Sequence, residues 1–409
     1  MSETETVVII GGGQAGSECA FALRQQQFAG RIVLVGEEPL LPYRRPPLSK
    51  TFLAGEVQAE SLLIRAAATY QQQNIECRMG QRVVALDRTA KSVTLDEGTV
   101  IGYTHLVFAT GGRARALPLP GGDKANVHTI RTVADVERLK ADFAPGKRLV
   151  VIGGGYIGLE AAAVGIKCGL EVTVVEALPR VLARVAVPEI SAFYEQAHRR
   201  RGVKFITGVG VQTLEGGERI EAVLLSDGQR LPVDVVIVGI GIIPNTELAA
   251  AAGLEVNQGI VVNAEARTAD PAIFAIGDCA HHENVFFGRS LRVESVPHAM
   301  EHGRTAAAAI CGKPVPYAAV PWFWSDQFDL KLQMVGLSEG FDSMVVRGDL
   351  AAESFCVFYL RDGVVLSADA VNRPQEFATA KQLVGQRMKV SEGLLRDESQ
   401  PLKALLVKA

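Results

Sequence analysis

Short apolar runs recur along the chain, separated by glycine-rich or polar turns. The runs at 6–10 and 148–152 are rich in β-branched residues and do not alternate with polar positions, which is typical of parallel strands buried on both faces. Each run is followed by a glycine turn, an alanine-rich stretch with helical spacing, and a second apolar run at 31–35 or 171–175. This pattern predicts two βαβ units.

The remaining pattern extends each unit. Strands are expected at 81–86 and 92–95, with a hairpin turn at Asp96-Glu97-Gly98, and a buried strand at 103–109 closes the first unit. The second unit repeats the arrangement, with a hairpin near Ser226-Asp227-Gly228 and a buried strand at 233–239.

Residues 241–245 are expected to begin the return to the first unit, and the composition changes near 321, where both tryptophans lie. The predicted fold class is α/β, with two Rossmann-like dinucleotide-binding domains of glutathione-reductase-like type and a C-terminal α+β domain. The predicted domains are 1–113 with 241–320, 114–240, and 321–409.

Both glycine turns have the spacing of a dinucleotide fingerprint. In this motif the first glycine permits a tight turn, the second lets the backbone approach a pyrophosphate, and the third lets helix pack on strand. The positive end of the helix then attracts the phosphates, and an acidic residue after the second strand binds a ribose diol. The candidates are Gly11, Gly13, Ala15, Gly16 and Glu37 in the first unit, and Gly153, Gly155, Tyr156, Ile157, Gly158 and Glu176 in the second. A chain with two such sites is expected to pass electrons between two dinucleotides.

Composition and charge narrow the class of protein. With 409 residues, 48% of them hydrophobic, the chain is long enough for two or three domains. Its 42 basic and 45 acidic side chains give a formal charge of −3, which does not indicate nucleic-acid or membrane binding. No apolar run reaches the ~18 residues of a membrane span, and the first residues lack the basic start of a signal peptide. A cytoplasmic protein is expected.

The six cysteines are dispersed without a CxxC pair, and no His or Cys spacing indicates a metal site. They are expected to be reduced and mainly buried. A flavoprotein that reduces disulfides needs a thiol beside its flavin, and the segment between Glu37 and Phe52 contains none. The pair His281-His282 is expected on a solvated loop, without a catalytic role.

Further segments identify a superfamily. Thr268-Ala269-Asp270-Pro271 followed by Ala275-Ile276-Gly277-Asp278 resembles the second FAD motif of two-dinucleotide flavoprotein reductases. The strand end Ala109-Thr110-Gly111 and the crossing Gly239-Ile240-Gly241 also occur in the expected order. The chain therefore resembles the glutathione-reductase-like superfamily.

A closer resemblance is to the NADH-dependent ferredoxin reductases of oxygenase systems. It is carried by the segments Arg45-Pro46-Pro47-Leu48-Ser49-Lys50, Gly153 to Glu160, Arg292 to Pro297 and Trp322 to Gln327, and it covers essentially the whole chain. The resemblance implies tightly but non-covalently bound FAD, NADH as donor and a [2Fe–2S] ferredoxin as acceptor. The ferredoxin would serve a haem-thiolate monooxygenase or an aromatic-ring dioxygenase. We expect a monomer or weak dimer.

The resemblance also implies site residues. Those for FAD, besides the first fingerprint and Glu37, are Arg45, Pro46, Lys50, Val83, Ala109, Thr110, Gly111, Arg131, Gly277, Asp278 and Val296. Those for NADH, besides the second fingerprint and Glu176, are Arg184, Gly239, Ile240 and Gly241. Two departures stand close to expected flavin contacts: Arg44 replaces an acidic residue, and His298 stands where asparagine is common.

Three residues are expected to act at the flavin. Lys50 and Glu160 are predicted to form an ion pair at the N5 edge, since a buried ammonium needs a carboxylate partner. The alternatives are a solvated lysine and a helix-surface carboxylate. Trp324 is predicted to cover the flavin edge below the docking surface, with core packing as its alternative.

Charges suggest the donor and the acceptor surface. Glu176 would repel the 2′-phosphate of NADPH and so favours NADH, although Arg180 or Arg184 could reach a phosphate. Since ferredoxins are usually acidic, the acceptor face should be basic, with Arg304 and Lys331 as candidates.

Two other functions share both nucleotide sites. NADH oxidases or peroxidases of this fold use a cysteine near the flavin, which the matching stretch lacks. A redox signalling protein resembling apoptosis-inducing factor would use flavin reduction to switch shape. Such proteins tend to carry targeting segments or basic surfaces, and neither is expected in this chain.

Overall fold

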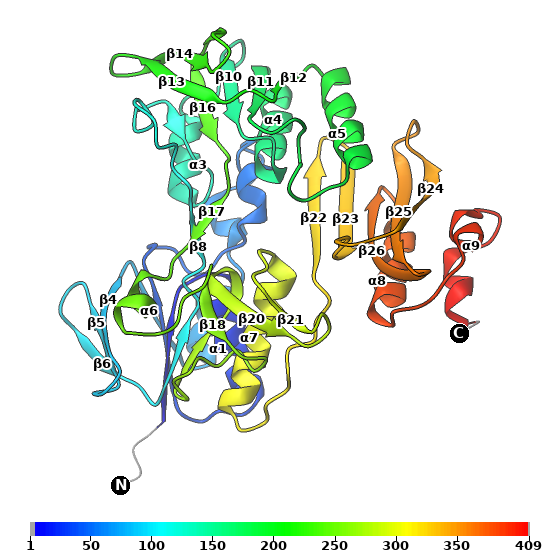
Figure 1. The fold of residues 1–409 in the computed structure, drawn as a ribbon. Coiled ribbons are helices and arrows are strands. Elements are labelled where there is room, and N and C mark those ends of the chain that lie inside the picture. The colour runs from blue at the N-terminus through cyan, green and yellow to red at the C-terminus, as the bar shows by residue number, and fades with distance from the viewer. Residues whose placement is uncertain (1–4, 408–409) are drawn as a thin grey trace.

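The computed structural model describes residues 5–407. A five-stranded parallel sheet in the order β19-β7-β1-β2-β3 forms the lower part of the molecule in Figure 1. Alternate residues of β1 face opposite sides: Val7 and Ile9 pack with helices α1 and α7, and Val8 and Ile10 pack on the other face. The elements are β1 (Thr6–Ile10), α1 (Gln14–Gln25), β2 (Arg31–Gly36), α2 (Ala67–Gln72), β3 (Ile75–Met79), β7 (His105–Phe108), β19 (Ile273–Ala275) and α7 (Val296–Ile310).

Two small sheets and several short helices surround the first sheet. The antiparallel sheet β4-β5-β6 contains the hairpin turn expected after Leu95, and β18-β20-β21 lies beside α7 in Figure 1. The elements are η1 (Pro46–Ser49), η2 (Ala59–Leu62), β4 (Val83–Asp87), β5 (Ser92–Leu95), β6 (Val100–Gly102), α6 (Glu247–Ala251), β18 (Ile260–Val262), η3 (Gly277–Cys279), β20 (Ala280–Asn284) and β21 (Arg289–Leu291).

A second parallel sheet, in the order β12-β11-β10-β16-β9, forms the upper part of the molecule. The antiparallel ribbon of β8 and β17 connects it to the first sheet. The elements are β8 (Gly112–Ala114), β9 (Val127–His128), α3 (Val133–Lys140), β10 (Arg148–Ile152), α4 (Tyr156–Lys167), β11 (Glu171–Glu176), α5 (Pro188–Arg200), β12 (Lys204–Thr207), β13 (Val211–Gly216), β14 (Ile220–Leu225), β15 (Arg230–Pro232), β16 (Val235–Val238) and β17 (Ile242–Pro244).

The C-terminal part is an antiparallel sheet in the order β22-β23-β26-β25-β24, with helices on one face. On β25, Cys356 and Phe358 face these helices, whereas Phe355 and Val357 face the second nucleotide unit. The elements are β22 (Trp322–Gln327), β23 (Leu330–Gly336), β24 (Ser343–Asp349), β25 (Ser354–Arg361), β26 (Val364–Val371), α8 (Pro374–Gly385), α9 (Glu392–Arg396) and η4 (Leu402–Val407).

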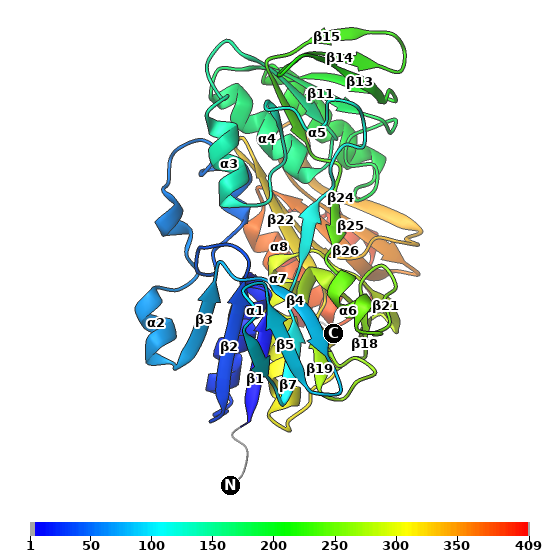
Figure 2. The same cartoon turned by 90° about the vertical axis from the view of Figure 1, so that its left-hand side faces the viewer.

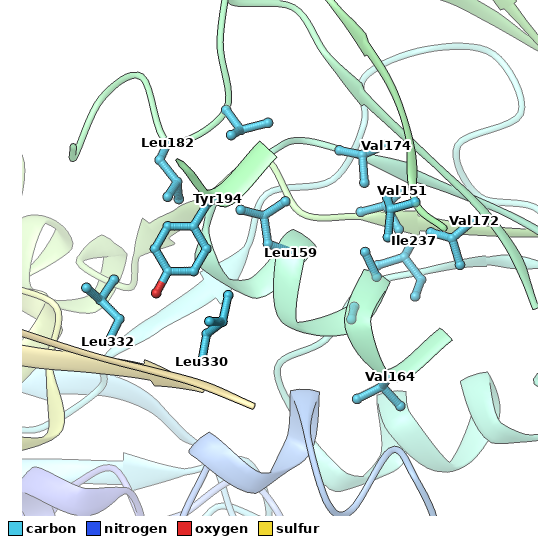
Figure 3. Close-up of a cluster of buried hydrophobic side chains, with 14 of the residues drawn as sticks. Val151, Leu159, Val164, Val172, Val174, Leu182, Tyr194, Ile237, Leu330 and Leu332 are labelled. Atoms are coloured by element: carbon cyan, nitrogen blue, oxygen red, sulfur yellow. The ribbon is translucent and has the colours of Figure 1, made fainter. Parts of the chain in front are cut away.

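One hydrophobic cluster joins all three parts. In Figure 3, Leu330 and Leu332 of β23 lie beside Leu159 of α4 and Tyr194 of α5. The same cluster includes Phe52, which follows η1. Figure 2 shows the C-terminal sheet between the two parallel sheets and behind them. The second unit therefore shares a core with both other parts.

The fold class expected from the sequence is confirmed, while the division at 113/114, 240/241 and 320/321 stays a prediction. The expectation of a solvated loop at His281-His282 is wrong, because both residues lie in β20 and His282 is fully buried. Strand pairing with β18 and β21 makes alternate side chains of β20 point inward. Within residues 5–407, no helix is long and apolar enough to cross a bilayer.

The close approach of α7 to α1 gives a stability prediction. A Cβ at Gly303 would stand 2.9 Å from the Ala15 carbonyl oxygen, which belongs to the α1 backbone and cannot move alone. Gly303→Ala should lower the free energy of unfolding by about 1–3 kcal/mol. Gly393→Ala in α9 is the matched control, because no atom lies within 4 Å of its added Cβ. It should be neutral or stabilise by up to about 1 kcal/mol. Urea denaturation measures both, and equal effects would contradict the packing account.

Candidate functional site

The first fingerprint forms a cradle that only glycines permit. Gly11 has φ +124°, and a Cβ there would stand 2.1 Å from the Ala109 carbonyl oxygen. A Cβ at Gly16 would stand 2.1 Å from the Gly11 oxygen, so the helix packs directly on the turn. At Gly13, by contrast, an added Cβ would meet nothing within 4 Å. The middle glycine therefore opens onto free space, where a ligand can approach the backbone.

The second fingerprint repeats this geometry. Gly153 has φ +108°, and its added Cβ would stand 2.5 Å from the Gly239 oxygen and 3.3 Å from the Ile240 side chain. The added Cβ of Gly158 would stand 2.1 Å from the Gly153 oxygen, and that of Gly155 would meet nothing within 4 Å. Gly239 and Ile240 thus close the second cradle as Ala109 closes the first.

A helix begins at each cradle without a side-chain cap. The N-cap residues are Gly13 for α1 and Gly155 for α4, and neither helix has an acidic residue in its first turn. The first N–H groups and the positive end of each helix dipole are therefore left for an anion. Both cradles fit a dinucleotide pyrophosphate by this donor set.

The two acidic residues differ in placement. Glu176 accepts hydrogen bonds from the Gly154 N–H (2.7 Å) and the Leu178 N–H (2.8 Å), so its carboxylate is fixed against the second cradle. Glu37 follows β2, its side chain is 72% exposed, and a carboxylate oxygen lies 3.8 Å from the Arg82 guanidinium. Glu176 is therefore preorganised for a ribose, whereas Glu37 is free to move toward one.

Arg180 and Arg184 also differ in their contacts. The Arg180 guanidinium donates to the carbonyls of Ala183 and Ala186 and to the Ser191 hydroxyl, so it holds its own loop together. Arg184 is exposed, and its Nη2 lies 3.8 Å from the position of a Cβ on Gly241. Of the two arginines, Arg184 is the one placed to reach a bound nucleotide.

Several predicted flavin contacts converge beside α1. An added Cβ on Gly277, at φ +70°, would stand 3.0 Å from the Ala15 Cβ. The next residue, Asp278, accepts from Arg131 Nη2 at 3.2 Å. The same Nη2 would lie 3.3 Å from a Cβ on Gly111. Strand ends remote in sequence are thereby brought to one edge of the first sheet, where parallel α/β sheets bind ligands.

The remaining predicted flavin residues lie around this edge. The Arg45 guanidinium donates to the Glu38 carboxylate (2.6 Å) and the Arg131 carbonyl (2.5 Å). The Thr110 hydroxyl donates to the Asn245 carbonyl at 2.7 Å, which ties the first strand end to β17. Pro46 begins η1, Val83 begins β4 with its side chain in the core, and Val296 begins α7. Their contacts with a cofactor stay predictions.

The predicted pair of Lys50 and Glu160 is present. Lys50 Nζ lies 2.7 Å from Glu160 Oε2, and the two side chains are 17% and 1% exposed. Burial raises the pKa of Glu160, and the Lys50 ammonium together with hydrogen bonds from Ser325 and Ser49 acts against that rise. The pair lies where η1, α4 and β22 meet, so Glu160 is not the helix-surface carboxylate of its alternative, and Lys50, at 17% exposed, is not a solvated lysine.

Two serines that we did not predict complete this pair. The Ser49 hydroxyl donates to Glu160 Oε2 at 2.5 Å, and the Ser325 hydroxyl donates to Oε1 at 2.6 Å. Gln327 Nε2 donates to Ser325 at 3.1 Å and its Oε1 contacts His198 Nε2 at 2.8 Å. Both serines belong to segments that carried the family resemblance, and this could have singled them out.

Trp324 lies in β22, directly before Ser325. Its ring centroid is 5.6 Å from that of Trp322 and 6.5 Å from that of Phe323. Trp322 packs on the C-terminal core, whereas none of the hydrophobic clusters formed by the described residues includes Trp324. This favours a contact role over core packing. Tyr156, from the second fingerprint, packs on Phe323 at 4.9 Å, while the side chain of its neighbour Ile157 is exposed.

The two candidates for a basic acceptor face, Arg304 and Lys331, differ in their surroundings, and Arg44, the departure from the family pattern, has its own partner. Arg304 pairs with Glu18 at 2.8 Å and Glu301 at 3.0 Å, so it adds little net positive charge to an acceptor face. Arg44 is exposed and donates to the Ser61 carbonyl at 2.7 Å, which turns it toward η2. Lys331 is exposed on β23 as a docking residue would be.

All six cysteines are free. Burial raises the pKa of every one of these thiols, to about 11 for Cys77. Since the thiolate is the reactive form, none of them has the environment of a redox-active cysteine.

Two glycine cradles in two Rossmann-like sheets are the arrangement expected of a protein with two dinucleotide sites. Residues 5–303 match the family described as pyridine nucleotide-disulphide oxidoreductase, and residues 322–406 match the one described as reductase C-terminal. The chain belongs to the pyridine nucleotide-disulphide oxidoreductase family.

Known relatives have the same length and fold. The chain is 48% identical to putidaredoxin reductase CamA of Pseudomonas putida, over 100% of this chain and 98% of that one. It is 41% identical to the ferredoxin–NAD(+) reductase component of the anthranilate 1,2-dioxygenase system of Burkholderia cepacia, over 98% of each. The reductase in the covalent putidaredoxin reductase–putidaredoxin complex superposes with a TM-score of 0.96, covering 99% of each chain at 48% identity. The resemblance to ferredoxin reductases of oxygenase systems is therefore confirmed.

The buried pair predicts a large effect of one substitution. Glu160→Gln keeps the side-chain shape but leaves the mostly buried Lys50 ammonium without its charge partner, so the free energy of unfolding should fall by about 3 kcal/mol. Glu195→Gln is the control, since Glu195 pairs with Arg199 one turn away on the surface of α5. It should cost under about 0.5 kcal/mol. Chemical denaturation of both variants measures the difference, and a loss at Glu160 as small as at Glu195 would refute the importance of the pair.

Proposed function

We propose that the chain is an NADH-dependent ferredoxin reductase with FAD bound tightly and non-covalently at the first cradle and NADH at the second. The observation that carries this proposal is the Lys50–Glu160 pair, which joins η1 of the first unit to α4 of the second. The names of the relatives support the ferredoxin as acceptor. When bound, FAD accepts a hydride at N5 and releases single electrons.

The chain's residues would bind and orient these molecules. The N-termini of α1 and α4 would hold the two pyrophosphates, and Asp278 would accept a hydroxyl of the flavin chain. Lys50 would place its ammonium at the N5 edge, and Glu160 would keep that ammonium in position beside the nicotinamide. Trp324 would cover the flavin edge and shorten the protein gap to the acceptor.

The thiols support an iron–sulfur acceptor over a disulfide or peroxide. With all six sulfurs free and their pKa values raised by burial, no side chain is suited to take an electron pair from the flavin. Electrons would then leave singly to a [2Fe–2S] ferredoxin of a monooxygenase or dioxygenase system. Reduced thiols also fit a cytoplasmic protein, which we expect to work as a monomer or weak dimer.

Cytochrome c reduction over a small panel of [2Fe–2S] ferredoxins tests the proposal. NADH should support rapid reduction only when a ferredoxin is present. Raising salt should slow this reaction and leave NADH-driven reduction of a small dye nearly unchanged, because docking depends on charge and hydride transfer does not. Steady hydrogen peroxide formation without ferredoxin would instead indicate an oxidase. Slow hydride transfer with a long-lived charge-transfer complex would indicate a signalling role.

The fixed carboxylate of Glu176 predicts a preference for NADH. The ratio of kcat/KM for NADH to that for NADPH should exceed one in the wild type and fall by about tenfold in Glu176→Gln, a change equivalent to about 1.4 kcal/mol. Arg184→Gln is the companion variant, and it should weaken NADPH more than NADH if this arginine approaches the 2′-phosphate. A wild-type ratio of these kcat/KM values below one would contradict the assignment of NADH as the donor.

A further inference from the structure

Three histidines lie together between α7 and β20. His298 and His302 are four residues apart on α7 and therefore share a face, and His282 points toward them from β20. Their ring centroids are 4.7 to 5.0 Å apart, and one nitrogen from each ring can be chosen so that all three lie within 4.8 Å of one another. Sequence spacing alone did not reveal this cluster, because His282 joins it only through the fold.

The cluster is buried, and its ring nitrogens lack partners. His282 and His302 are 0% exposed and His298 is 2% exposed. Both nitrogens of His282 and the Nε2 atoms of His298 and His302 have no hydrogen-bond partner among the described residues. Buried polar atoms are rarely left unpaired, so four in one cluster point to a ligand-binding role for these rings.

The neighbours prepare at least one ring for coordination. His298 Nδ1 contacts the Tyr317 hydroxyl at 2.8 Å, and a proton on Nδ1 leaves the Nε2 lone pair free toward the cluster. Burial lowers the pKa of His298 to about 4 and that of His282 to about 3, and it also lowers that of His302. Neutral imidazole is the form that binds metals.

A cavity lies beside one member of the cluster, His298. A cavity of about 230 Å³ is lined by His298 and Tyr317 together with Pro297, Glu301, Trp322 and Lys381. It reaches the protein surface beside α7, where Glu301 is exposed. His298 is the member of the cluster that lines this cavity, so an ion arriving from it would pass this ring to reach His282 and His302.

We propose that His282, His298 and His302 form a binding site for one divalent transition metal ion, with Zn²⁺ as the best fit. Three imidazoles with an open fourth position are an established zinc ligand set. Nitrogens at about 2.1 Å from a tetrahedral zinc lie about 3.4 Å apart, so the rings must each shift by under about 1 Å. The ion would fasten α7 to β20 and so fix the helix whose first residue, Val296, is a predicted flavin contact.

One existing contact must be given up. His302 Nδ1 accepts from the Gly277 N–H at 3.3 Å, which places the ring proton on Nε2. Coordination through Nε2 moves that proton to Nδ1 and breaks this long hydrogen bond. A hydrogen bond of this length is weak, and a zinc–imidazole bond is far stronger than the contact it replaces.

Metal content of the purified, tag-free, flavin-loaded protein is the first test. The protein is treated with EDTA, incubated with Zn²⁺, passed through a desalting column and analysed by mass spectrometry of the metal. We expect about one Zn²⁺ per chain for the wild type, and below about a tenth of that for His298→Asn and for His302→Gln. His281→Asn is the matched control, because His281 lies on the same strand outside the cluster, and it should keep about one Zn²⁺.

X-ray absorption at the zinc edge is the second test, and it needs only the wild type. Three imidazole nitrogens at about 2.0 to 2.1 Å are expected. If a variant fails to fold, this measurement on the wild type still shows whether three histidines bind the zinc. A wild-type zinc content no higher than that of His298→Asn would overturn the proposal and leave a bound water or simple ring packing. Sulfur ligands, or fewer than three imidazoles, would overturn it as well. Neither readout depends on the proposed reductase activity.

Discussion

The buried carboxylate of Glu160 is the interaction on which the arrangement of the three parts depends. It lies in α4 of the second nucleotide unit, and it binds Lys50 and Ser49 from the first unit and Ser325 from the C-terminal sheet. A carboxylate that is 1% exposed is costly unless each oxygen has partners. Packing of the three parts by apolar contact alone would allow them to slide, whereas these directed bonds permit one arrangement. The pair therefore specifies the site more than it stabilises the fold.

The same glycine cradle occurs twice in the molecule, once in each of the first two units. Each cradle is made by a glycine whose Cβ would collide with the end of a neighbouring strand, at Ala109 in the first unit and Gly239 in the second. The middle glycine in each stays open, and the helix that follows offers uncapped N–H groups. Because the polar network at Glu160 connects η1 to α4, the two nucleotide sites are held together by the protein even without their ligands.

Features fixed by local chemistry could be predicted from the sequence, and features fixed by the fold could not. The β-branched runs predicted both parallel sheets, and the glycine spacing predicted both cradles, because each of these patterns lies within about 30 residues of sequence. The Lys50–Glu160 pair followed from the resemblance. Ser325 is 165 residues from Glu160, so the bond between them arises from the fold, although the resemblance of its segment to the family could have marked it as a site residue. The burial of His282 could not be predicted, because it arises from pairing with β18 and β21 and from packing under α7.

In the proposed function, two electrons enter this protein as a hydride from NADH at the second cradle. They leave the flavin at the first cradle one at a time. The most direct measurement is the stoichiometry of ferredoxin reduction under anaerobic conditions, with limiting NADH and excess oxidised [2Fe–2S] ferredoxin. The account predicts two reduced ferredoxins for each NADH consumed. NADH consumption that leaves the ferredoxin oxidised, or that fails to occur with any ferredoxin of the panel, would contradict it.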